Sequence, residues 1–392
     1  MPTHKPLIYL DHNATTPIDP CVRKAMTPFL DTQYGNPSSQ HALGREAARA
    51  IELARREVGL LLDCRSDELI FTSGGTESSN LAILGTLLTS APSTPSHIIT
   101  SAIEHPATLE PLKMAEKWGC ELSIVGCDTN GVVDTRAIAA AIRPQTKLVS
   151  IMHANNEIGS IQPIQDIARI CNKSGILFHV DAAQTVGKIP ISCRDLSVDL
   201  MTVAGHKFYA PKGIGCLYIR QGVVLSGLLQ GGGQECGLSP GTESVANIVA
   251  LGKASELARQ NCGHDAERIG MLRDQLESRL EEKTQGAILI HAQGAQRLNN
   301  TTSIAFPDVG AMDLLNKIPF LCASTGAACH SHATTISATL REIGATESVA
   351  RGTIRMSLGR QNNADEIEQV ANALVSAWRA TRAPGPASAP VS

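Results

Sequence analysis

Three short stretches of the sequence place a chemically useful side chain beside glycine or other small residues. They are FTSGGTES (Phe71–Ser78), HVDAAQ (His179–Gln184) and AGHKFYAPKG (Ala204–Gly213). In the first, a strand runs into Ser73–Thr76 and a helix is predicted over Ser78–Leu88, so free N–H groups and the helix dipole would face an anion. A phosphate group would fit there, although a purely structural glycine turn produces the same pattern.

The other two stretches each carry a charged side chain at the end of a predicted strand. Asp181 ends a hydrophobic strand, where parallel sheets bind ligands, and a buried carboxylate there needs a cationic partner. A protonated pyridine nitrogen is one candidate, and an N-cap of a following helix is the alternative. Lys207 follows another strand, where burial would lower the pKa of its amine and make it usable for a Schiff base. A solvated surface lysine is the alternative, so the prediction for Lys207 depends on the three stretches together.

The elements that would position these residues alternate between short apolar strands and amphipathic helices. Ala47, Ile51, Ala54, Val58 and Leu61 repeat at the three-and-four spacing of a helix with one buried stripe. Continuous apolar strands between such helices indicate a mostly parallel sheet covered on both faces, which is an α/β domain. The predicted strands are Leu69–Thr72, His97–Thr100, Leu122–Val125, Leu148–Met152, Ile176–Val180 and Leu200–Val203.

The pattern changes after Val245, where longer charged helices replace the short alternating elements. This change indicates a second, smaller α+β domain. Its predicted elements are two helices and two strands, at residues 246–261, 266–284, 303–306 and 353–358.

We therefore predict two domains and a tail. The large domain would cover residues 18–245, and the small domain would combine residues 1–17 with 246–382. Residues 383–392, rich in proline, alanine and serine, are expected to form a disordered tail. With 392 residues, of which 43% are hydrophobic and 18% charged, the chain has the balance of a soluble globular protein.

Charge and cysteine content exclude several other classes of protein. A net charge of -3 and the absence of a long basic run give no electrostatic footprint for nucleic acid or an anionic membrane. No stretch approaches the ~20 apolar residues that span a bilayer, and Met1–Leu10 lacks a signal-peptide pattern, so we expect a cytoplasmic protein. The 11 cysteines form no C-x-x-C pair and no cluster with zinc-site spacing, which predicts neither a disulfide framework nor a metal site.

Further motifs accompany these three stretches along nearly the whole chain. They are YLDHNATTP (Tyr9–Pro17), YGNPSS (Tyr34–Ser39), SAIEH (Ser101–His105), HANNEIG (His153–Gly159), GGGQE (Gly231–Glu235), PGTE (Pro240–Glu243), STGAACHS (Ser324–Ser331) and IRMSLGR (Ile354–Arg360). In this order, the motifs resemble the class V aminotransferase superfamily of fold type I pyridoxal-phosphate (PLP) enzymes, specifically its cysteine desulfurase and selenocysteine lyase branch. The resemblance implies an α/β fold with a large domain, whose mostly parallel sheet is flanked by helices, and a smaller α+β domain.

The resemblance implies that PLP is the cofactor, and it assigns roles to residues of the motifs. Lys207 would carry PLP as a Schiff base and move the substrate's α-proton, while Asp181 would keep the pyridine nitrogen protonated so that the ring accepts electrons. His105 would stack on the ring. The other cofactor contacts would come from Gly75, Thr76 and His206 at the phosphate, Gln184 at the phenolic oxygen, and Thr242 of the partner subunit. The substrate would be bound by Asn36, Asn156 and Arg355, the last through the bidentate geometry of a guanidinium.

The resemblance also implies that Cys329, in STGAACHS, attacks the sulfur or selenium of the substrate. Alanine would be released, and a persulfide or selenopersulfide would remain on Cys329. The attack requires a thiolate, and a segment of small residues, expected to be a mobile loop, would bring it to the cofactor. His330 and His332 would favour the thiolate or act as acids, unless they are simply solvated.

Several residues depart from the commoner desulfurase pattern. Ala204 stands where many members have a phosphate-binding serine, which removes one hydroxyl donor and would lower the affinity for PLP. Cys236 and Ser239 replace arginines that are frequent in that segment, so their charge contacts near a dimer active site would be missing. Pro106 stands where the animal selenocysteine lyases have an aspartate, although GAACHS, GHKFY, and GGGQE with PGTE look more like those lyases.

The predicted function is a PLP-dependent conversion of L-cysteine to L-alanine with a persulfide on Cys329, and L-selenocysteine is an additional or alternative substrate. A homodimer and a protein that accepts the sulfur or selenium are further implied partners. Two other classes stay open: a class V aminotransferase or other PLP lyase in which Cys329 is incidental, and a non-catalytic sulfur-trafficking scaffold. Replacement of Cys329 tests the first, and loss of the PLP colour on replacement of Lys207 tests the second.

Overall fold

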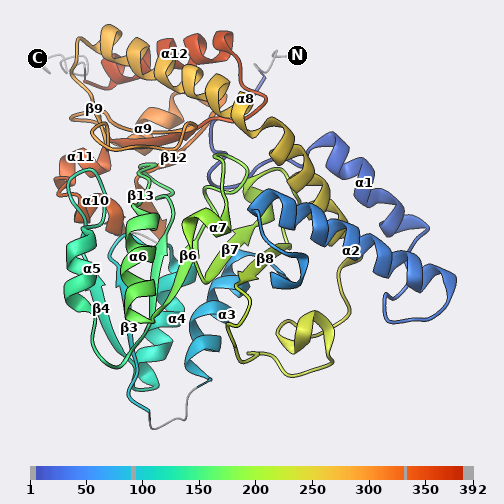
Figure 1. Ribbon diagram of the computed structural model, residues 1–392. Coiled ribbons are helices and arrows are strands. Elements are labelled where there is room, and N and C mark those ends of the chain that lie inside the picture. Colours follow the sequence, from blue (N-terminus) through green and yellow to red (C-terminus); the bar gives the residue numbers. More distant parts are fainter. Residues whose placement is uncertain (1–5, 90–93, 331–332, 383–392) are drawn as a thin grey trace, which may run out of the picture.

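A seven-stranded sheet forms the centre of the larger part of the molecule (Figure 1). The structure is a computed structural model that describes residues 6–89, 94–330 and 333–382, without the side chains of residues 327–335. The strand order is β2-β8-β7-β6-β5-β3-β4, and β8 pairs antiparallel with both of its neighbours while the remaining pairs are parallel. The strands are β2 Leu69–Thr72, β3 His97–Ser101, β4 Glu121–Val125, β5 Thr146–Met152, β6 Leu177–Asp181, β7 Leu200–Ala204 and β8 Gly215–Ile219. The predicted mostly parallel sheet and its six strands are therefore confirmed, whereas β8 was not predicted.

Neighbouring residues of one strand belong to different hydrophobic clusters on the two faces of this sheet. Ile98 and Leu148 pack on one side, and Ile99 and Val149, the next residues, pack on the other. Successive side chains of a strand point to opposite faces, so an all-apolar strand requires helices on both. The first face is covered by α3 (Gly75–Leu87) and α4 (Pro106–Lys117), and the second by α5 (Thr135–Ala141) and α6 (Ile164–Ser174).

Two further helices pack on the second cluster at the opposite end of the sheet from β4. They are α1 (Pro20–Asp31) and α2 (Ala42–Leu62), and both contact α8 (Val245–Thr284). The predicted buried stripe of α2 is confirmed except at its end, where Leu62 is fully buried and Leu61 only partly so. At Gly252 of α8 an added Cβ would lie 2.5 Å from the Cα of Ala54, so the glycine lets α8 and α2 approach closely.

The long helix α8 corrects the prediction of two helices separated near Gly263, because it continues without a break for 40 residues. Its first half packs on the cluster under the large sheet and its second half on a separate cluster (Figure 1). Gly263 is exposed to open space, and one helical glycine costs only about 1 kcal/mol relative to alanine. Packing at both ends of α8 outweighs that local preference.

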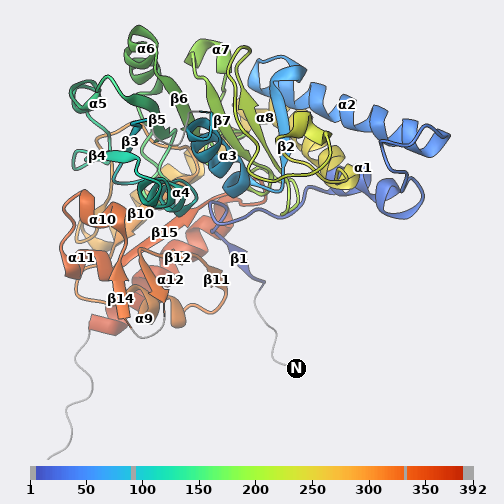
Figure 2. The same ribbon diagram turned by 90° about the horizontal axis from the view of Figure 1, so that it is seen from below.

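A four-stranded antiparallel sheet, with the order β12-β15-β10-β9, forms the centre of the smaller part. Its strands are β9 Leu289–Ile290, β10 Thr301–Ala305, β12 Ser324–Thr325 and β15 Thr353–Ser357. The second half of α8 packs with α12 (Ala364–Arg382) over this sheet (Figure 2). The remaining helices of the smaller part are α9 Ala311–Asn316, α10 Ala338–Glu342 and α11 Glu347–Arg351. The predicted fold, a large α/β part with a smaller α+β part, is confirmed.

The amino-terminal segment joins the smaller part before it enters the larger one. β1 (Ile8–Tyr9) pairs in parallel with β11 (Leu321–Cys322), and Ile8 and Leu10 belong to the hydrophobic cluster of the smaller part. A hairpin of β13 (Ala327–His330) and β14 (Ala333–Ile336) follows β12, and the short helix α7 is Cys193–Leu196. The domain boundaries at residues 17/18 and 245/246 stay a prediction, and the predicted tail at 383–392 lies outside the described residues.

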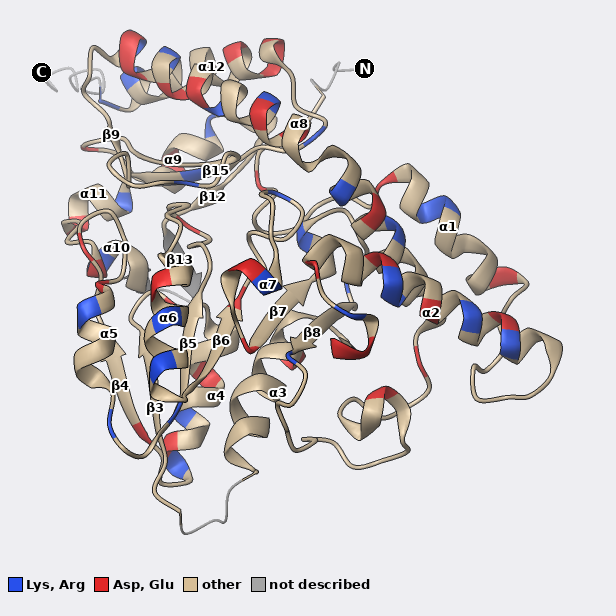
Figure 3. Cartoon of the chain, in the orientation of Figure 1, with Lys and Arg blue, Asp and Glu red and all other residues tan. Residues whose placement is uncertain are grey.

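Charged residues of both signs are interspersed along the outer helices α2, α8 and α12 (Figure 3). Many form ion pairs three residues apart on one helix, such as Arg49 with Glu46 and Arg279 with Glu282. Exposed pairs of this kind contribute only about 0.3–0.5 kcal/mol each. Among the described residues, no helix combines the length and the apolar character that crossing a membrane requires.

Candidate active site

A cavity of about 220 Å³ opens at the carboxyl ends of β5, β6 and β7, beside the first turn of α3. Such an edge is where parallel sheets bind their ligands. Eight of the residues predicted to bind cofactor or substrate line this cavity. They are Gly75, Thr76, His105, Asn156, Asp181, Gln184, His206 and Lys207.

The first turn of α3 forms one end of the cavity. The helix begins at Gly75, three residues before the predicted start, because Gly74 has a φ of 152°, which favours glycine, and turns the chain directly from β2 into the helix. A Cβ at Gly75 would lie 3.2 Å from the Cβ of Ala204, so the glycine allows β7 and the helix start to approach closely. No side chain caps the helix, and Gly75 and Thr76 of its first turn line the cavity. This end therefore fits an anion such as phosphate.

His206 and Ala204 lie beside this helix end. The His206 Nδ1 is 3.1 Å from the Thr15 Oγ1. Burial, together with the nearby charges of Lys207 and other lysines, lowers the pKa of His206 to about 4. His206 is thus neutral at pH 7 and would offer an anion a hydrogen bond but no charge. Ala204 lines the cavity without a polar group.

Asp181 is the last residue of β6 and is buried. Its Oδ1 accepts a hydrogen bond from the Ala183 N–H, and turns rather than a helix follow, so the helix-cap alternative is not realised. Burial raises the pKa of Asp181, and the charges of His105 and Lys207, which act in the opposite direction, do not compensate. A cationic ring nitrogen in the cavity would stabilise the ionised carboxylate of Asp181 and offset the effect of its burial.

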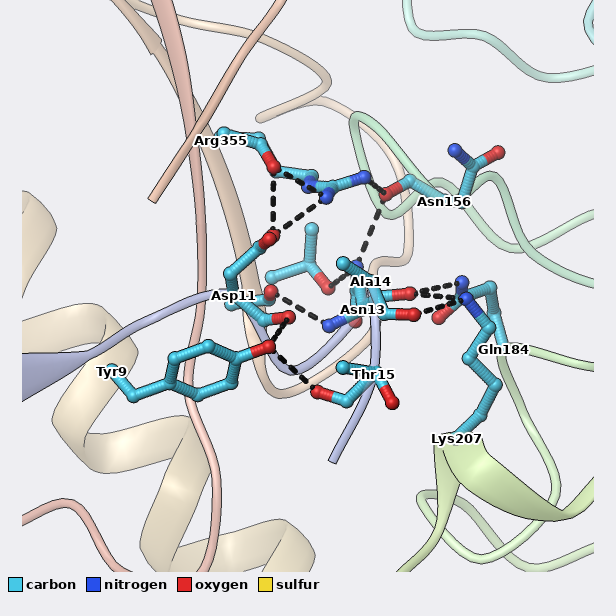
Figure 4. A network of polar contacts seen from close by, with 12 residues as sticks. Tyr9, Asp11, Asn13, Ala14, Thr15, Asn156, Gln184, Lys207 and Arg355 are labelled. Atoms are coloured by element: carbon cyan, nitrogen blue, oxygen red, sulfur yellow. Dashed lines mark hydrogen bonds and ion pairs between the residues drawn. The ribbon is translucent and has the colours of Figure 1, made fainter. Parts of the chain in front are cut away.

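Lys207 ends a 3-10 turn, Gly205–Lys207, directly after β7. Its Nζ donates hydrogen bonds to the carbonyl oxygens of Asn13 (2.7 Å) and Ala14 (2.9 Å), as Figure 4 shows. Burial, and next the charge of Arg355, lower the pKa of Lys207 to about 8. A tenth or so of such amines are neutral one pH unit below that value, so Lys207 is available as a nucleophile near pH 7.

His105 is the N-cap of α4, with Pro106 at the first helical position, which suits proline. Its Nδ1 accepts a hydrogen bond from the Ala107 N–H at 3.1 Å. Burial lowers the pKa of His105, so the ring is neutral and carries its proton on Nε2. The ring is therefore held at the cavity wall in one tautomer.

Arg355, on β15, does not line the cavity but belongs to a polar network that includes the cavity residue Asn156 (Figure 4). Its Nη2 donates to Asp11 Oδ1 (2.7 Å) and to Ser324 Oγ (2.9 Å), and its Nη1 donates to the Asn156 carbonyl oxygen (3.1 Å). The buried Nε has no partner among the described residues. Three of the five guanidinium N–H groups are thus used, so a substrate carboxylate would bind the remaining N–H groups or displace one of the present acceptors, and Asn156 connects Arg355 to the cavity.

Three predicted residues do not line the cavity within the single chain: Arg355, Asn36 and Thr242. Asn36 is exposed in the connection between α1 and α2, where its Oδ1 accepts from the Ser38 N–H. Thr242 lines a different cavity together with Ser239, whose Oγ donates to Glu77 Oε1 at 2.7 Å. Cys236 is exposed and has a φ of 57°. Any contact of Thr242 or Asn36 with the 220 Å³ cavity would have to come from another subunit.

The predicted nucleophile, Cys329, lies on β13, and its backbone pairs with Thr334 of β14. The segment thus forms a strand paired with β14 rather than the expected loop, and the threonines of β14 favour extended backbone. The side chains of Cys329 and His330, and all of His332, lie outside the described residues.

The sequence prediction missed polar residues that hold the site together from behind the cavity. Asn13 accepts at its carbonyl from both Lys207 and Gln184, and its side chain accepts from the Lys188 Nζ at 2.8 Å. Glu104, in the SAIEH motif, is buried and accepts from the Met152 N–H and the Ser101 hydroxyl. Asn13 lies in the YLDHNATTP motif and Glu104 in the SAIEH motif, but the sequence assigned neither residue a role.

Comparison with known proteins identifies the family. The family model described as aminotransferase class-V matches residues 8–370. The chain belongs to this class V family. A curated relative, the cysteine desulfurase IscS of Dictyoglomus turgidum, is 42% identical over 94% of this chain and 93% of its own length. The cysteine desulfurase of Gluconacetobacter diazotrophicus is 42% identical over 93% of this chain and 91% of its own length.

Solved structures of class V relatives superpose on nearly the whole chain. A NifS-like protein has a TM-score of 0.88 at 36% identity and covers 94% of this chain and 98% of its own. A structure described as SspA in complex with cysteine has a TM-score of 0.78 at 33% identity over 89% of this chain and 98% of its own. The class V fold, with PLP as the cofactor of the family, is thereby established.

The cavity fits PLP in each of its parts. The first turn of α3 suits a phosphate, the under-compensated Asp181 suits a pyridinium, and the amine of Lys207 suits an aldehyde. These three groups line one cavity of the right chemistry. The residues present therefore agree with a PLP site.

Proposed function

We propose that this chain is a PLP-dependent cysteine desulfurase that converts L-cysteine to L-alanine and retains the sulfur as a persulfide on Cys329. The observation that carries the proposal is the convergence of Lys207, Asp181 and the first turn of α3 on one cavity, in a chain that has a cysteine at the family's nucleophile position. The relatives at 42% identity that are named cysteine desulfurases favour this reaction over transamination.

In this proposal one set of residues binds the phosphate of PLP and a different residue binds its ring nitrogen. Gly75, Thr76 and His206 bind the phosphate, and Asp181 pairs with the ring nitrogen. When bound, PLP supplies an electron sink that stabilises negative charge at the substrate's α-carbon. His105, neutral and fixed by the Ala107 N–H, covers one side of the ring.

Lys207 and Arg355 handle the substrate. The Lys207 Nζ, with its pKa near 8, accepts the α-proton and returns a proton to the product. The substrate carboxylate binds Arg355, which offers its remaining N–H groups or exchanges one of its present acceptors, the Asn156 carbonyl or Asp11, for the ligand.

Cys329 performs the sulfur transfer as a thiolate. Its Sγ forms a bond to the substrate sulfur while the substrate Cβ–S bond breaks, and the bonding electron pair stays on Cβ. Protonation of Cβ completes L-alanine, and Cys329 carries one additional sulfur atom, so no external oxidant or reductant is needed. A thiol on the acceptor partner would later take this sulfur.

Several finer features belong to the same proposal. Thr242 and Asn36 act from the partner chain of a homodimer, since neither lines the cavity of its own chain. L-selenocysteine is accepted as well, because a selenium atom can undergo the same attack. The protein works in the cytoplasm with a sulfur-accepting or selenium-accepting protein.

Mass spectrometry of the PLP-loaded protein tests the proposal directly. After incubation with L-cysteine, the tryptic peptide that contains Cys329 should gain one sulfur atom, and L-alanine should appear in equal initial amount. Cys329→Ala should abolish both while the protein still binds PLP. Cys21→Ala, which removes an exposed cysteine elsewhere, is the matched control and should retain both. Unchanged alanine production by Cys329→Ala would reject the persulfide mechanism.

The same assay with L-selenocysteine measures the substrate preference. A gain of one selenium atom on Cys329, at a rate within tenfold of the sulfur reaction, is expected if the site does not discriminate. Mixing active-site variants tests the dimer, because inactive Lys207→Ala and Thr242→Ala chains should regain activity when they are combined in one heterodimer.

A further inference from the structure

Lys188 lies behind the proposed PLP site and contacts two of its residues (Figure 4 shows Gln184 and Asn13). We propose that Lys188 is a positioning residue, whose amine fixes the Gln184 amide so that Gln184 presents an N–H, not a C=O, to the phenolic oxygen of PLP. The inference rests on the proposed function, because it requires PLP in the cavity.

The contacts of the Lys188 amine determine which atom of the Gln184 amide faces which neighbour. The Lys188 Nζ donates to Gln184 Oε1 and to Asn13 Oδ1, each at 2.8 Å. Gln184 Oε1 is therefore an acceptor, and the opposite atom, Nε2, donates to the Asn13 carbonyl at 3.0 Å. The two ends of an amide have nearly the same shape, so hydrogen-bonding partners rather than packing choose the orientation.

Of the two contacts that orient Gln184, the one from Lys188 is independent of the cofactor lysine. The Asn13 carbonyl, which faces Gln184 Nε2, is also an acceptor for the Lys207 Nζ. Lys207 changes its bonding when it reacts with PLP, whereas the Lys188 amine bonds the other end of the Gln184 amide, at Oε1. Lys188 can thus hold the amide in both situations.

The charge environment of Lys188 favours this role over that of an ion-pair partner. Burial of the amine, followed by the charges of Lys207 and Arg355, lowers its pKa well below the usual range. The acceptors of the Lys188 amine are two amide oxygens, Gln184 Oε1 and Asn13 Oδ1, rather than a carboxylate. Lys188 also lines a small cavity of about 30 Å³ together with Lys207.

Removal of the amine would affect Gln184 more than Asn13. Asn13 Oδ1 also accepts from the Asn300 Nδ2 at 3.1 Å, so Asn13 keeps a donor in Lys188→Met. Gln184 Oε1 would lose its donor, and the amide would be free to turn its oxygen toward the cavity. An oxygen there would face the phenolic oxygen of PLP, and a hydrogen bond to a charged group would be lost, which weakens binding by roughly tenfold or more.

Lys188→Met, Gln184→Ala and the double variant test the inference. The dissociation constant of PLP and the absorption spectrum of the bound cofactor are measured at one fixed pH for each protein. We expect Lys188→Met to weaken PLP binding about tenfold and to shift intensity from the visible band toward the near-ultraviolet. In the Gln184→Ala background, Lys188→Met should change the constant less than twofold, because the residue acts through Gln184. Lys173→Met, on the exposed end of α6, is the matched control and should match wild type.

The outcomes separate this inference from the proposed function. Wild-type protein that fails to bind PLP would refute the proposed function itself. Normal binding and a normal spectrum in Lys188→Met, or a tenfold effect that persists without Gln184, would overturn the role of Lys188. Lys188→Gln, which keeps two N–H donors on a side chain one atom shorter, should restore part of the visible band. If Lys188→Met does not fold, a crystal structure of the PLP-loaded wild type decides, since a Lys188 amine bonded away from Gln184 would also refute the inference.

Discussion

Replacement of Glu104 by glutamine should make the cofactor-free protein more stable at pH 7 and change how stability depends on pH. Glu104 is fully buried beneath the cavity, and burial raises its pKa from 4.5 to about 8. Its Oε1 accepts from the Ser101 hydroxyl (2.6 Å) and the Met152 N–H (2.9 Å), while the buried Oε2 has no partner. A glutamine keeps the accepting oxygen and places its NH2 where the protonated acid carries its O–H.

The size and sign of the effect follow from proton linkage. The folded protein binds the Glu104 proton more tightly than the unfolded chain, so stability is fully present below pH 4.5 and falls as the pH rises toward 8. Between pH 4.5 and pH 7 the loss is about 3 kcal/mol, at 1.36 kcal/mol for each pH unit. Glu104→Gln cannot ionise and lacks this loss. The variant should therefore exceed wild type by about 3 kcal/mol at pH 7 and match it near pH 4.5.

Urea denaturation at pH 5, 6 and 7, followed by circular dichroism, measures this difference as the change in unfolding free energy between wild type and variant. Glu110→Gln is the matched control, because Glu110 lies exposed on α4, the helix that begins two residues after Glu104, and pairs with Lys113. The control should follow the wild-type pH dependence. Parallel pH profiles for wild type and Glu104→Gln would show that Glu104 is ionised in the folded protein and would refute the reasoning.

Three further perturbations test other parts of the site. Ala204→Ser should tighten PLP binding about tenfold in a fluorescence titration, because a hydroxyl beside Gly75 adds a donor for the phosphate, and weaker binding would contradict this placement. The rate of PLP attachment should rise about tenfold per pH unit up to about pH 8 and level off above it, since only the neutral Lys207 amine reacts; a rate already constant at pH 6 would exclude Lys207 as the titrating group. Arg55→Met should cost about 3–5 kcal/mol in urea denaturation, because it leaves Glu235 buried without its partner at 2.6 Å, whereas Arg49→Met, in an exposed pair, should cost under about 1 kcal/mol. In the Arg55→Met/Glu235→Gln double variant most of the loss should disappear.

The parts of the fold that the sequence predicted are those whose cause is local. β6 and β7 are apolar runs of four or five residues, and their ends place Asp181 and Lys207 at the same edge of the sheet. Periodicity alone is enough to locate such strands. The predicted start of α3 was wrong by three residues, because the glycines that signal a turn also serve as its first helical positions.

Non-local packing determined what the sequence could not predict. The continuity of α8 across Gly263 depends on two separate sets of packing partners, α1 and α2 for its first half and the small sheet with α12 for its second half. Lys188 has the sequence context of an exposed lysine in a turn, and only the tertiary structure places its amine between Asn13 and Gln184. Asn36 and Thr242 differ from Lys188, because their motifs predict that they belong to the site, but neither of them lines the cavity in the single chain.

The position of Lys207 in this structure depends on a segment far from it in sequence. The carbonyl oxygens of Asn13 and Ala14 hold the Lys207 amine, and they belong to a stretch that begins at β1 in the smaller part of the molecule. The same stretch anchors Arg355 through Asp11, and Arg355 in turn lowers the pKa of Lys207. The residue that attaches PLP and the residue proposed to bind the substrate carboxylate are thus coupled through the amino-terminal segment. Displacement of Asp11 from Arg355 by a substrate carboxylate would therefore act on the electrostatic environment of Lys207 at the moment when its proton transfer begins.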